Sequence, residues 1–249
     1  GANTVGLDNV AVGTAALGAN TTGVENTAVG YQALDANTTG ANNSAVGSGA
    51  LGAETTGVNN VAVGYQALLV QVGATGNVAV GKSAGDALTT GSNNVAVGLD
   101  ALGAETTGIN NVAIGKGALV TQAGASDNIA IGTDAGNALT TGVDNVAVGL
   151  DALGAATIAT NCVAIGKNAL LACTTGIKNI CIGVGAGDSL TTGANNIVIG
   201  DGSDCSAVGS VNQITIGNAI TNTADERVII GSATAYIACD FGTDATWDR

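Results

Sequence analysis

Residues 26–40 read NTAVGYQALDANTTG, and near copies of this phrase follow one another along most of the 249-residue chain. In each copy a glycine comes directly after a Val or an Ile. These thirteen glycines recur at a constant 17-residue interval, at positions 13, 30, 47, 64, 81, 98, 115, 132, 149, 166, 183, 200 and 217. A fixed short period is typical of a solenoid or a fibrous array, in which each copy forms one coil and each residue column stacks on itself.

The VAVG stretch that ends at each glycine predicts a short β-strand, because β-branched residues alternate with a small residue. The two Val/Ile columns should share one face of the strand, with the Ala column on the other. We expect the Val/Ile columns, including Val97 and Ile114, to point into the core. Alanine fills the middle column in the first ten copies, which indicates close packing on that face too. The cover would be either the YQAL-type segment of the same coil or another chain.

Two further columns are polar. Asn stands four residues before the glycine in eleven copies, with Cys162 and Gln213 as the exceptions. Amides stacked about 4.8 Å apart predict a hydrogen-bonded ladder, and a row of metal ligands is the alternative. Eight copies also carry Thr-Thr-Gly, as at Thr21 and Thr22. Adjacent threonines on a strand point to opposite sides, so they predict a solvated corner rather than a flat ice-binding row.

A second, longer period is superimposed on the 17-residue period. AGDALTTG at 84–91, AGNALTTG at 135–142 and AGDSLTTG at 186–193 recur with a 51-residue spacing, which is three coils. In these coils glycine replaces the usual leucine, and Leu88, Leu139 and Leu190 appear three residues later. We interpret this longer period as the duplication of a three-coil block, and we expect the shifted leucines to remain in the core.

Composition excludes several classes of function. The net charge is −13 with only six basic residues, which argues against binding nucleic acid or an anionic membrane. No apolar run approaches the roughly 18 residues that span a bilayer, so no membrane insertion is expected. The chain has no His, which removes Ser-His-Asp and Cys-His arrangements and His-based metal sites. Carboxylates such as Asp134 and Asp144 are scattered, so no catalytic residue, metal ligand or cofactor site is expected.

Two groups of residues remain as weaker candidates. DGSD at 201–204 could bind calcium, although a polar turn is favoured because the calcium-binding nonapeptide pattern is absent. The odd number of cysteines and the lack of a C-x-x-C pair predict that most are free, small buried residues. The cysteines are Cys162, Cys173, Cys181, Cys205 and Cys239.

The end of the chain breaks the period. After Gly217 the next VIIG glycine is Gly231, so this copy is shorter than the others. Tyr236, Phe241 and Trp247 follow it and bring three of the five aromatic residues to the end of the chain. We therefore predict a solenoid of thirteen coils over 1–217. Residues 218–249 are predicted to be an irregular capping or neck segment that leads to a missing C-terminal domain. Because residue 1 is not Met, we expect a processed chain or a fragment.

The N-x-A-(V/I)-G coil resembles repeats in two related groups of fibrous proteins, over nearly the whole chain. One is the left-handed β-roll head of trimeric autotransporter adhesins. The other is the repeat region of phage tail fibres, and the NTAVGYQAL and NTTG wording of residues 26–40 favours this second group. Residues 241–249, FGTDATWDR, are similar to the approach to the self-cleaving chaperone domain of such fibres. Both resemblances imply a homotrimer.

The resemblance implies an all-β β-solenoid that acts as the shaft or the receptor-binding head of a phage tail, without catalysis. The implied partners are other copies of the chain, other tail proteins and a host cell-surface glycan or protein, and the implied location is the virion or another cell-surface setting. Two alternatives stay open. One is a bacterial trimeric autotransporter-type adhesin, and the other is a polysaccharide-degrading tailspike.

Overall fold

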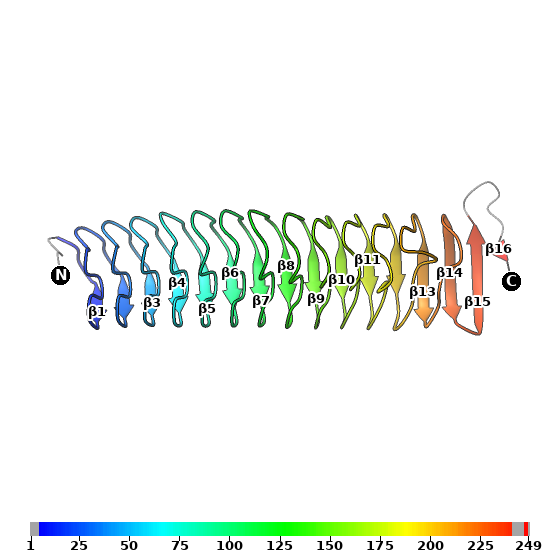
Figure 1. Ribbon diagram of the computed structural model, residues 1–249, viewed down its shortest axis with the longest axis horizontal. Helices are drawn as coiled ribbons and strands as arrows, with labels where there is room; N and C mark the ends of the chain where they lie inside the picture. The colour runs from blue at the N-terminus through cyan, green and yellow to red at the C-terminus, as the bar shows by residue number, and fades with distance from the viewer. Residues whose placement is uncertain (1–4, 241–246, 249) are drawn as a thin grey trace. The chain divides into compact units, whose positions relative to one another are not determined.

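The structure is a computed structural model that describes residues 5–240 and 247–248 (Figure 1). The fold is an all-β β-solenoid of thirteen turns, and no residue in the described part of the chain is helical. The chain divides into two compact units, Gly1–Asp127 and Asn128–Arg249. The predicted fold class and the 17-residue coil are confirmed, and each coil is made by consecutive residues of one chain.

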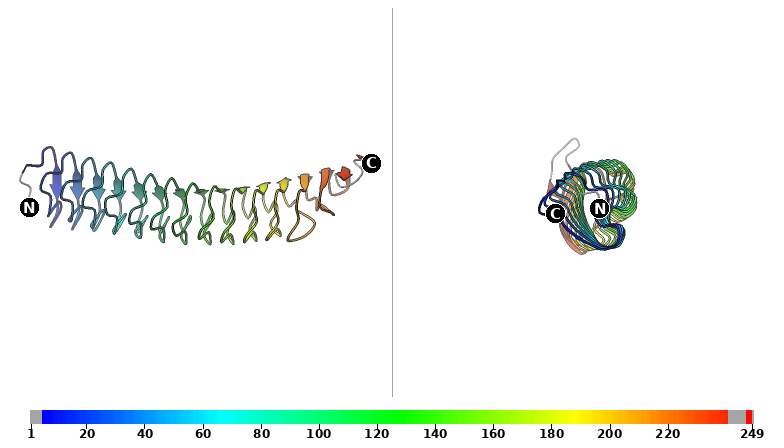
Figure 2. Two further views of the ribbon diagram at one scale, coloured as in Figure 1. Left: turned by 90° about the horizontal axis from the view of Figure 1, so that it is seen from above. Right: turned by 90° about the vertical axis from the view of Figure 1, so that its left-hand side faces the viewer.

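The first unit contributes one short strand from each coil. Its strands are β1 (Val10–Val12), β2 (Thr27–Val29), β3 (Ser44–Val46), β4 (Val61–Val63), β5 (Val78–Val80), β6 (Val95–Val97) and β7 (Val112–Ile114). Successive strands pair in parallel with the register of the sequence repeat, so that Val61 lies opposite Val78. Figure 2 shows the coils of a unit stacked one on the next. Every column of the sequence repeat therefore becomes a row along the unit.

The second unit repeats this arrangement. Its coil strands are β8 (Ile129–Ile131), β9 (Val146–Val148), β10 (Val163–Ile165), β11 (Ile180–Ile182), β12 (Ile197–Ile199) and β13 (Ile214–Asn218). They also pair in parallel and in register, as Val163 does with Ile180. Outside the strands, bridges such as Thr160 to Ile177 add a second line of pairing along the corners.

The segment after the last coil is more regular than the sequence predicts. β14 (Arg227–Ser232) continues the parallel stack, and β15 (Ala235–Asp240) and β16 (Trp247–Asp248) then pair antiparallel. Within the described part of 218–249, β14 and β15 are regular strands where the sequence predicted irregular structure, because the shortened copy around Gly231 still forms a strand. Its role as a cap or neck stays a prediction.

The aromatic residues assigned to this cap are described only in part. Tyr236 is half exposed, at 49%. Phe241 lies outside the described residues, and for Trp247 only the backbone placement in β16 is described. Arg227, at the start of β14, forms an ion pair with Asp240 at 3.3 Å, which ties the ends of β14 and β15 together.

The alanine column, not the Val/Ile columns, faces the core. Ala28 and Ala62 are fully buried and Ala96 is 2% exposed, whereas Ile114 is 37% exposed and Val97 is partly exposed. The prediction that Val97 and Ile114 point inward is therefore wrong. In most coils a small side chain occupies the inner face of the strand, because the coil is narrow and the opposite segment fills the rest of the interior. The bulk of the core comes instead from the leucines of the opposite segment, such as Leu34, which are fully buried.

The cover of the alanine column is the same chain, since these residues are buried with no second chain present. One coil shows the contact directly. Cys181 stands in the alanine column, and a Cβ added at Gly187, in the leucine column, would meet its Sγ at 2.5 Å. Of the two covers that the sequence left open, the YQAL-type segment of the same coil is confirmed.

The glycine that ends each strand is required by both conformation and space. Gly98 has a φ of 137°, and a Cβ at this position would lie 2.5 Å from the carbonyl oxygen of Gly115 in the next coil. An L-residue rarely adopts this φ, and the neighbouring coil leaves no room for a side chain. These glycines therefore serve both a positive φ and a close approach of neighbouring backbones.

Candidate functional site

The most extended feature of the surface is a double row of mainly β-branched side chains on the outer face of the strands. We call it the outer apolar face and define it by the first and third residues of the coil strands. In the first unit Val46, Val63 and Val80 are 37% to 40% exposed, and in the second unit Ile131, Ile165 and Ile182 are 37% to 39% exposed. Each residue stacks on its counterpart in the next coil, so each unit carries continuous rows without a charged side chain.

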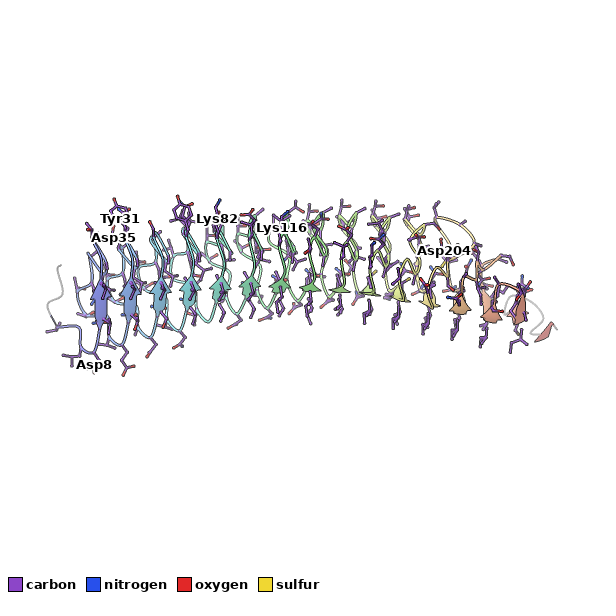
Figure 3. All side chains as sticks on the ribbon, turned by 90° about the horizontal axis from the view of Figure 1, so that it is seen from below. Asp8, Tyr31, Asp35, Lys82, Lys116 and Asp204 are labelled. Carbon is purple, nitrogen blue, oxygen red and sulfur yellow. The ribbon has the colours of Figure 1, made fainter. Side chains whose placement is uncertain are left out.

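The opposite edge of the coils is chemically mixed. Tyr31, Lys82 and Lys116 follow the strand-ending glycines and stand on the same edge of the first unit in Figure 3. Tyr31 is 56% exposed, and Lys82 is exposed, as expected for a solvated corner. This edge changes its chemistry from coil to coil, whereas the outer apolar face keeps nearly the same chemistry throughout each unit.

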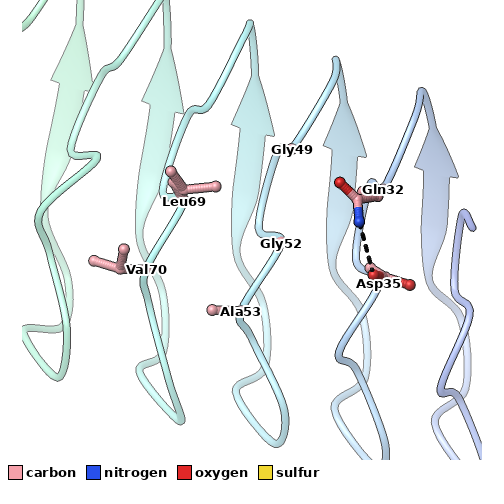
Figure 4. A pocket seen from close by; sticks show the side chains of 7 residues that line it. All are labelled: Gln32, Asp35, Gly49, Gly52, Ala53, Leu69 and Val70. Carbon is pink, nitrogen blue, oxygen red and sulfur yellow. Dashed lines mark hydrogen bonds between the residues drawn. The ribbon is translucent and has the colours of Figure 1, made fainter.

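A shallow depression of 280 Å³ lies on the mixed edge of the first unit (Figure 4). Gly49, Gly52 and Ala53 form its floor, because this coil has small residues where its neighbours carry larger ones. Gln32 and Asp35, joined by a 3.5 Å hydrogen bond, line one side, and the opposite side is aliphatic. The depression therefore combines one polar and one apolar wall, without a nucleophile or a metal-binding set.

The asparagine column forms the predicted ladder inside the coils. Asn60 Nδ2 donates to Asn43 Oδ1 at 3.1 Å and to the carbonyl of Ala74 at 2.8 Å. The backbone N–H of Asn60 also donates to Asn43 Oδ1, at 3.0 Å. Because both ends of the amide are used within the solenoid, this column acts as a structural ladder, and the interpretation as a row of metal ligands is wrong.

The Thr-Thr pairs form corners, as predicted. The first threonine of each pair is partly buried, and in six of the eight pairs it donates its hydroxyl to the next coil, as Thr38 Oγ1 does to Thr55 O at 3.1 Å. The second threonine, such as Thr39 or Thr56, is exposed. The two hydroxyls of a pair therefore differ in environment and do not form one flat row.

A second polar column lies inside the solenoid, seven residues after each of the first eleven strand-ending glycines, and sequence reasoning missed it. It contains Asn20, Asn37, Glu54, Gln71, Leu88, Glu105, Gln122, Leu139, Ala156, Cys173 and Leu190. All of these residues are buried, and the shifted leucines are among them, as predicted. The signal that could have revealed it was the 51-residue spacing, since Glu recurs at 54 and 105 and Gln at 71 and 122.

Two fully buried carboxylates in this column are held by backbone N–H groups. Glu54 Oε1 accepts hydrogen bonds from the N–H groups of Thr56 at 3.0 Å, Gly57 at 2.6 Å and Gly73 at 2.8 Å. Its Oε2 accepts from Gln71 Nε2 at 2.9 Å. Glu105 repeats the backbone contacts, with Gly108 N at 2.6 Å. Each carboxylate therefore fills its own cluster of N–H donors and serves as an internal turn support.

The other residues singled out in the sequence do not converge. Asp134 and Asp144 each occupy a left-handed turn position, with φ of 54° and 59°. Asp204, in the DGSD stretch, uses Oδ1 to accept from the N–H of Cys205 at 2.8 Å, which is the geometry of a polar turn. Within the described ranges, no three of the Cys, Asp and Glu side chains gather as a metal site would require.

All five cysteines are free and buried, in agreement with the sequence prediction. Burial raises the pKa of Cys181 well above its ordinary value, and that of Cys205 to about 12. These two thiols are therefore protonated at neutral pH, and neither has the character of a nucleophile.

Comparison of the chain with protein-family models, with curated proteins and with solved structures gives no match. In the part of the chain that the structure describes, there is also no helix of the length and apolarity that crossing a membrane requires. The candidate functional surface is therefore defined by its own chemistry, and its main feature is the outer apolar face.

Proposed function

We propose that the protein is a structural fibre component whose outer apolar face mediates assembly with other copies of the chain into a homotrimer. The observation that carries the proposal is the partial exposure of two long rows of mainly Val and Ile in each unit. Soluble monomers rarely leave contiguous apolar surface of this extent uncovered. In the first unit alone, seven strands at about 4.8 Å give rows of roughly 30 Å.

The repeat itself favours a copy of the same chain as the partner. Nearly every coil presents a pair of β-branched side chains at the same spacing, so a second copy matches the rows coil by coil. A cyclic assembly closes without leaving an unsatisfied face. The resemblance of residues 26–40 to trimeric fibres supports three copies as the number.

In this proposal the fibre belongs to a phage tail, as a shaft or receptor-binding head that attaches to a host-surface glycan or protein, and it acts without catalysis. The resemblance of the repeat sequence in residues 26–40 to phage tail fibres supports a place in the phage tail. The regular stacking of structural ladders supports a mechanical role, because nearly every polar column inside the coil is used to hold the next coil. A bacterial surface adhesin of the trimeric autotransporter type is the second candidate, which the same face would serve equally well.

Native mass spectrometry of the wild-type chain tests the assembly step, and the expected species is a trimer. The double variant Val63→Lys and Val80→Lys places charges on two adjacent outer positions and should release monomers that keep their β-type circular dichroism. Lys82→Ala, on the mixed edge, is the matched control and should remain trimeric. A folded wild-type monomer at micromolar concentration would contradict the proposal.

The tailspike alternative is tested separately by incubating the protein with host surface polysaccharide and measuring released oligosaccharides. We expect binding without release. Time-dependent appearance of reducing ends would show that the chain is a polysaccharide-degrading enzyme, whatever its oligomeric state.

A further inference from the structure

One coil of the second unit departs from the repeat in both of its internal polar columns. Cys162 replaces the residue of the asparagine column, and Cys173 replaces the residue of the second polar column in the same coil. The preceding coil has Asn145 and Ala156 at these two positions, and no other coil has a cysteine at either. The two substitutions therefore occur together.

The two columns converge inside a coil. In an ordinary coil the amides of Asn26 and Asn37 both donate to the carbonyl of Gly40, at 2.8 and 3.2 Å. Side chains at these two positions, eleven residues apart, thus point at one oxygen atom from two sides. The position of each thiol in the cysteine-containing coil follows from this geometry.

The cysteine pair keeps this convergence. Cys162 Sγ lies 3.4 Å from the carbonyl oxygen of Gly176, and a Cβ added at Gly176 would lie 2.7 Å from Cys173 Sγ. The thiols of Cys162 and Cys173 hydrogen-bond to each other, and both residues are fully buried. Both sulfur atoms therefore lie beside Gly176 in the interior of one coil.

The surroundings shift the pKa values of the two thiols in opposite directions. The hydrogen bond from Cys173 lowers the pKa of Cys162, against the effect of burial, and the N–H of Asn179 adds to the lowering. The hydrogen bond with Cys162, together with burial, raises the pKa of Cys173 far above its ordinary value. The two thiols therefore differ in acidity, with Cys162 the more acidic of the pair.

We propose that Cys162 and Cys173 are the site of an internal disulfide that links the two sides of this coil. The oxidant is a low-molecular-weight disulfide such as oxidised glutathione. One cysteine breaks the S–S bond of the oxidant and forms a mixed disulfide, releasing the first glutathione thiol. The second cysteine then attacks the protein sulfur of the mixed disulfide and releases the second glutathione thiol. The two cysteines lose two electrons and two protons, and both are recovered in two molecules of reduced glutathione.

Because both thiols are buried in the closed coil, the exchange takes place while the coil is open, during folding or local opening. The remaining cysteines are internal controls. Cys181 contacts the chain at Gly187, and burial keeps Cys205 protonated. The disulfide between Cys162 and Cys173 forms inside one coil, so it does not depend on whether the chain assembles into a fibre.

A tryptic peptide map can identify this disulfide, because a cleavage site lies between Cys162 and Cys173. Cleavage after Lys116, Lys167, Lys178 and Arg227 places Cys162 in peptide 117–167 and Cys173 in peptide 168–178. Cys181 and Cys205 share peptide 179–227, and Cys239 lies in 228–249. The full chain is refolded with oxidised glutathione, its free thiols are alkylated under denaturing conditions, and the trypsin digest is analysed without reductant.

The expected result is a linked pair of peptides 117–167 and 168–178 that separates on reduction, with Cys181, Cys205 and Cys239 alkylated. Cys162→Asn, which restores the repeat, and Cys173→Asn, the residue present at Asn20 and Asn37, should each fold and give four alkylated cysteines. Cys205→Ala should keep the linked pair. Alkylation of all five wild-type cysteines, or a link that involves any of the other three, would overturn the proposal.

Discussion

The inner and outer faces of the same three-residue strands differ in a way that hydrophobicity alone does not reveal. The inner column holds the smaller residue, as at Ala96, and is closed to solvent. The outer columns hold the larger residues, as at Val97, and are partly open. In a wide core the larger side chains would be buried first. In a coil this narrow, the available width decides which face of the strand is buried, so the face with the small residue is the inner one.

The largest expected effect separates the two faces by placing the same charge on each. Ala96→Asp should destabilise the chain by about 4 kcal/mol or more, because it buries an unpaired carboxylate in a space that fits only a methyl group. Val97→Asp should keep the β-type circular dichroism spectrum and lose only self-association. Far-UV circular dichroism during a urea titration distinguishes the two variants.

The control for this pair is Val97→Thr, which preserves β-branching and adds no charge. It should match the wild type in its free energy of unfolding to within about 0.5 kcal/mol. A Val97→Asp chain that is as unfolded as Ala96→Asp would show that the outer column is needed for the fold of the single chain.

The next effect concerns polar groups in the interior. Glu54→Ala should lower the free energy of unfolding by about 1–3 kcal/mol, because the N–H groups of Thr56, Gly57 and Gly73 lose their acceptor in a buried turn. Glu25→Ala removes a carboxylate from an exposed corner and should change the stability by less than about 0.5 kcal/mol. Denaturant unfolding monitored by circular dichroism measures both.

The contrast with Glu54→Gln sharpens this prediction. Glutamine keeps an oxygen acceptor for the backbone N–H groups but turns its NH2 group toward Gln71 Nε2, so it should recover part of the stability that alanine loses. Equal losses for the two variants would mean that the negative charge, rather than the acceptor geometry, holds the turn.

These comparisons indicate how far the sequence determines the fold. The period, the strands, the glycine corners and the asparagine ladder were predictable, because each is a property of one column repeated many times. The inward face was not, since a strand of alternating Val and Ala is consistent with either orientation until the width of the coil is known. The second polar column was missed because it mixes Asn, Glu, Gln, Leu and Cys, so only its 51-residue spacing marks it.

The candidate surface shows the same limit. Exposure of the Val/Ile rows follows from the inward alanines, and the sequence prediction had these two faces reversed. The contact between Cys162 and Cys173 depends on two columns that meet across a coil, which linear spacing does not indicate. The sequence predicted that most of the cysteines are buried, and all five are, but it could not pair them.

The smallest effect is expected at the exposed corner that precedes each asparagine of the ladder. This corner adopts a left-handed backbone, with φ of 59° at Asn161 and at Asn195, and most coils place Asn or Asp there. Lys178 occupies the same position with a φ of 55° and an exposed side chain. Asn tolerates this conformation better than Lys, because its short polar side chain hydrogen-bonds locally.

Lys178→Asn should therefore raise the free energy of unfolding by about 0.5 kcal/mol, and Lys178→Gly by about 0.5–1 kcal/mol, as expected for a glycine at positive φ. Lys167→Asn is the matched control, since it removes the same charge at an exposed position without a left-handed backbone and should leave the unfolding midpoint unchanged. A gain in both Asn variants would assign the effect to the loss of a lysine side chain rather than to the left-handed backbone.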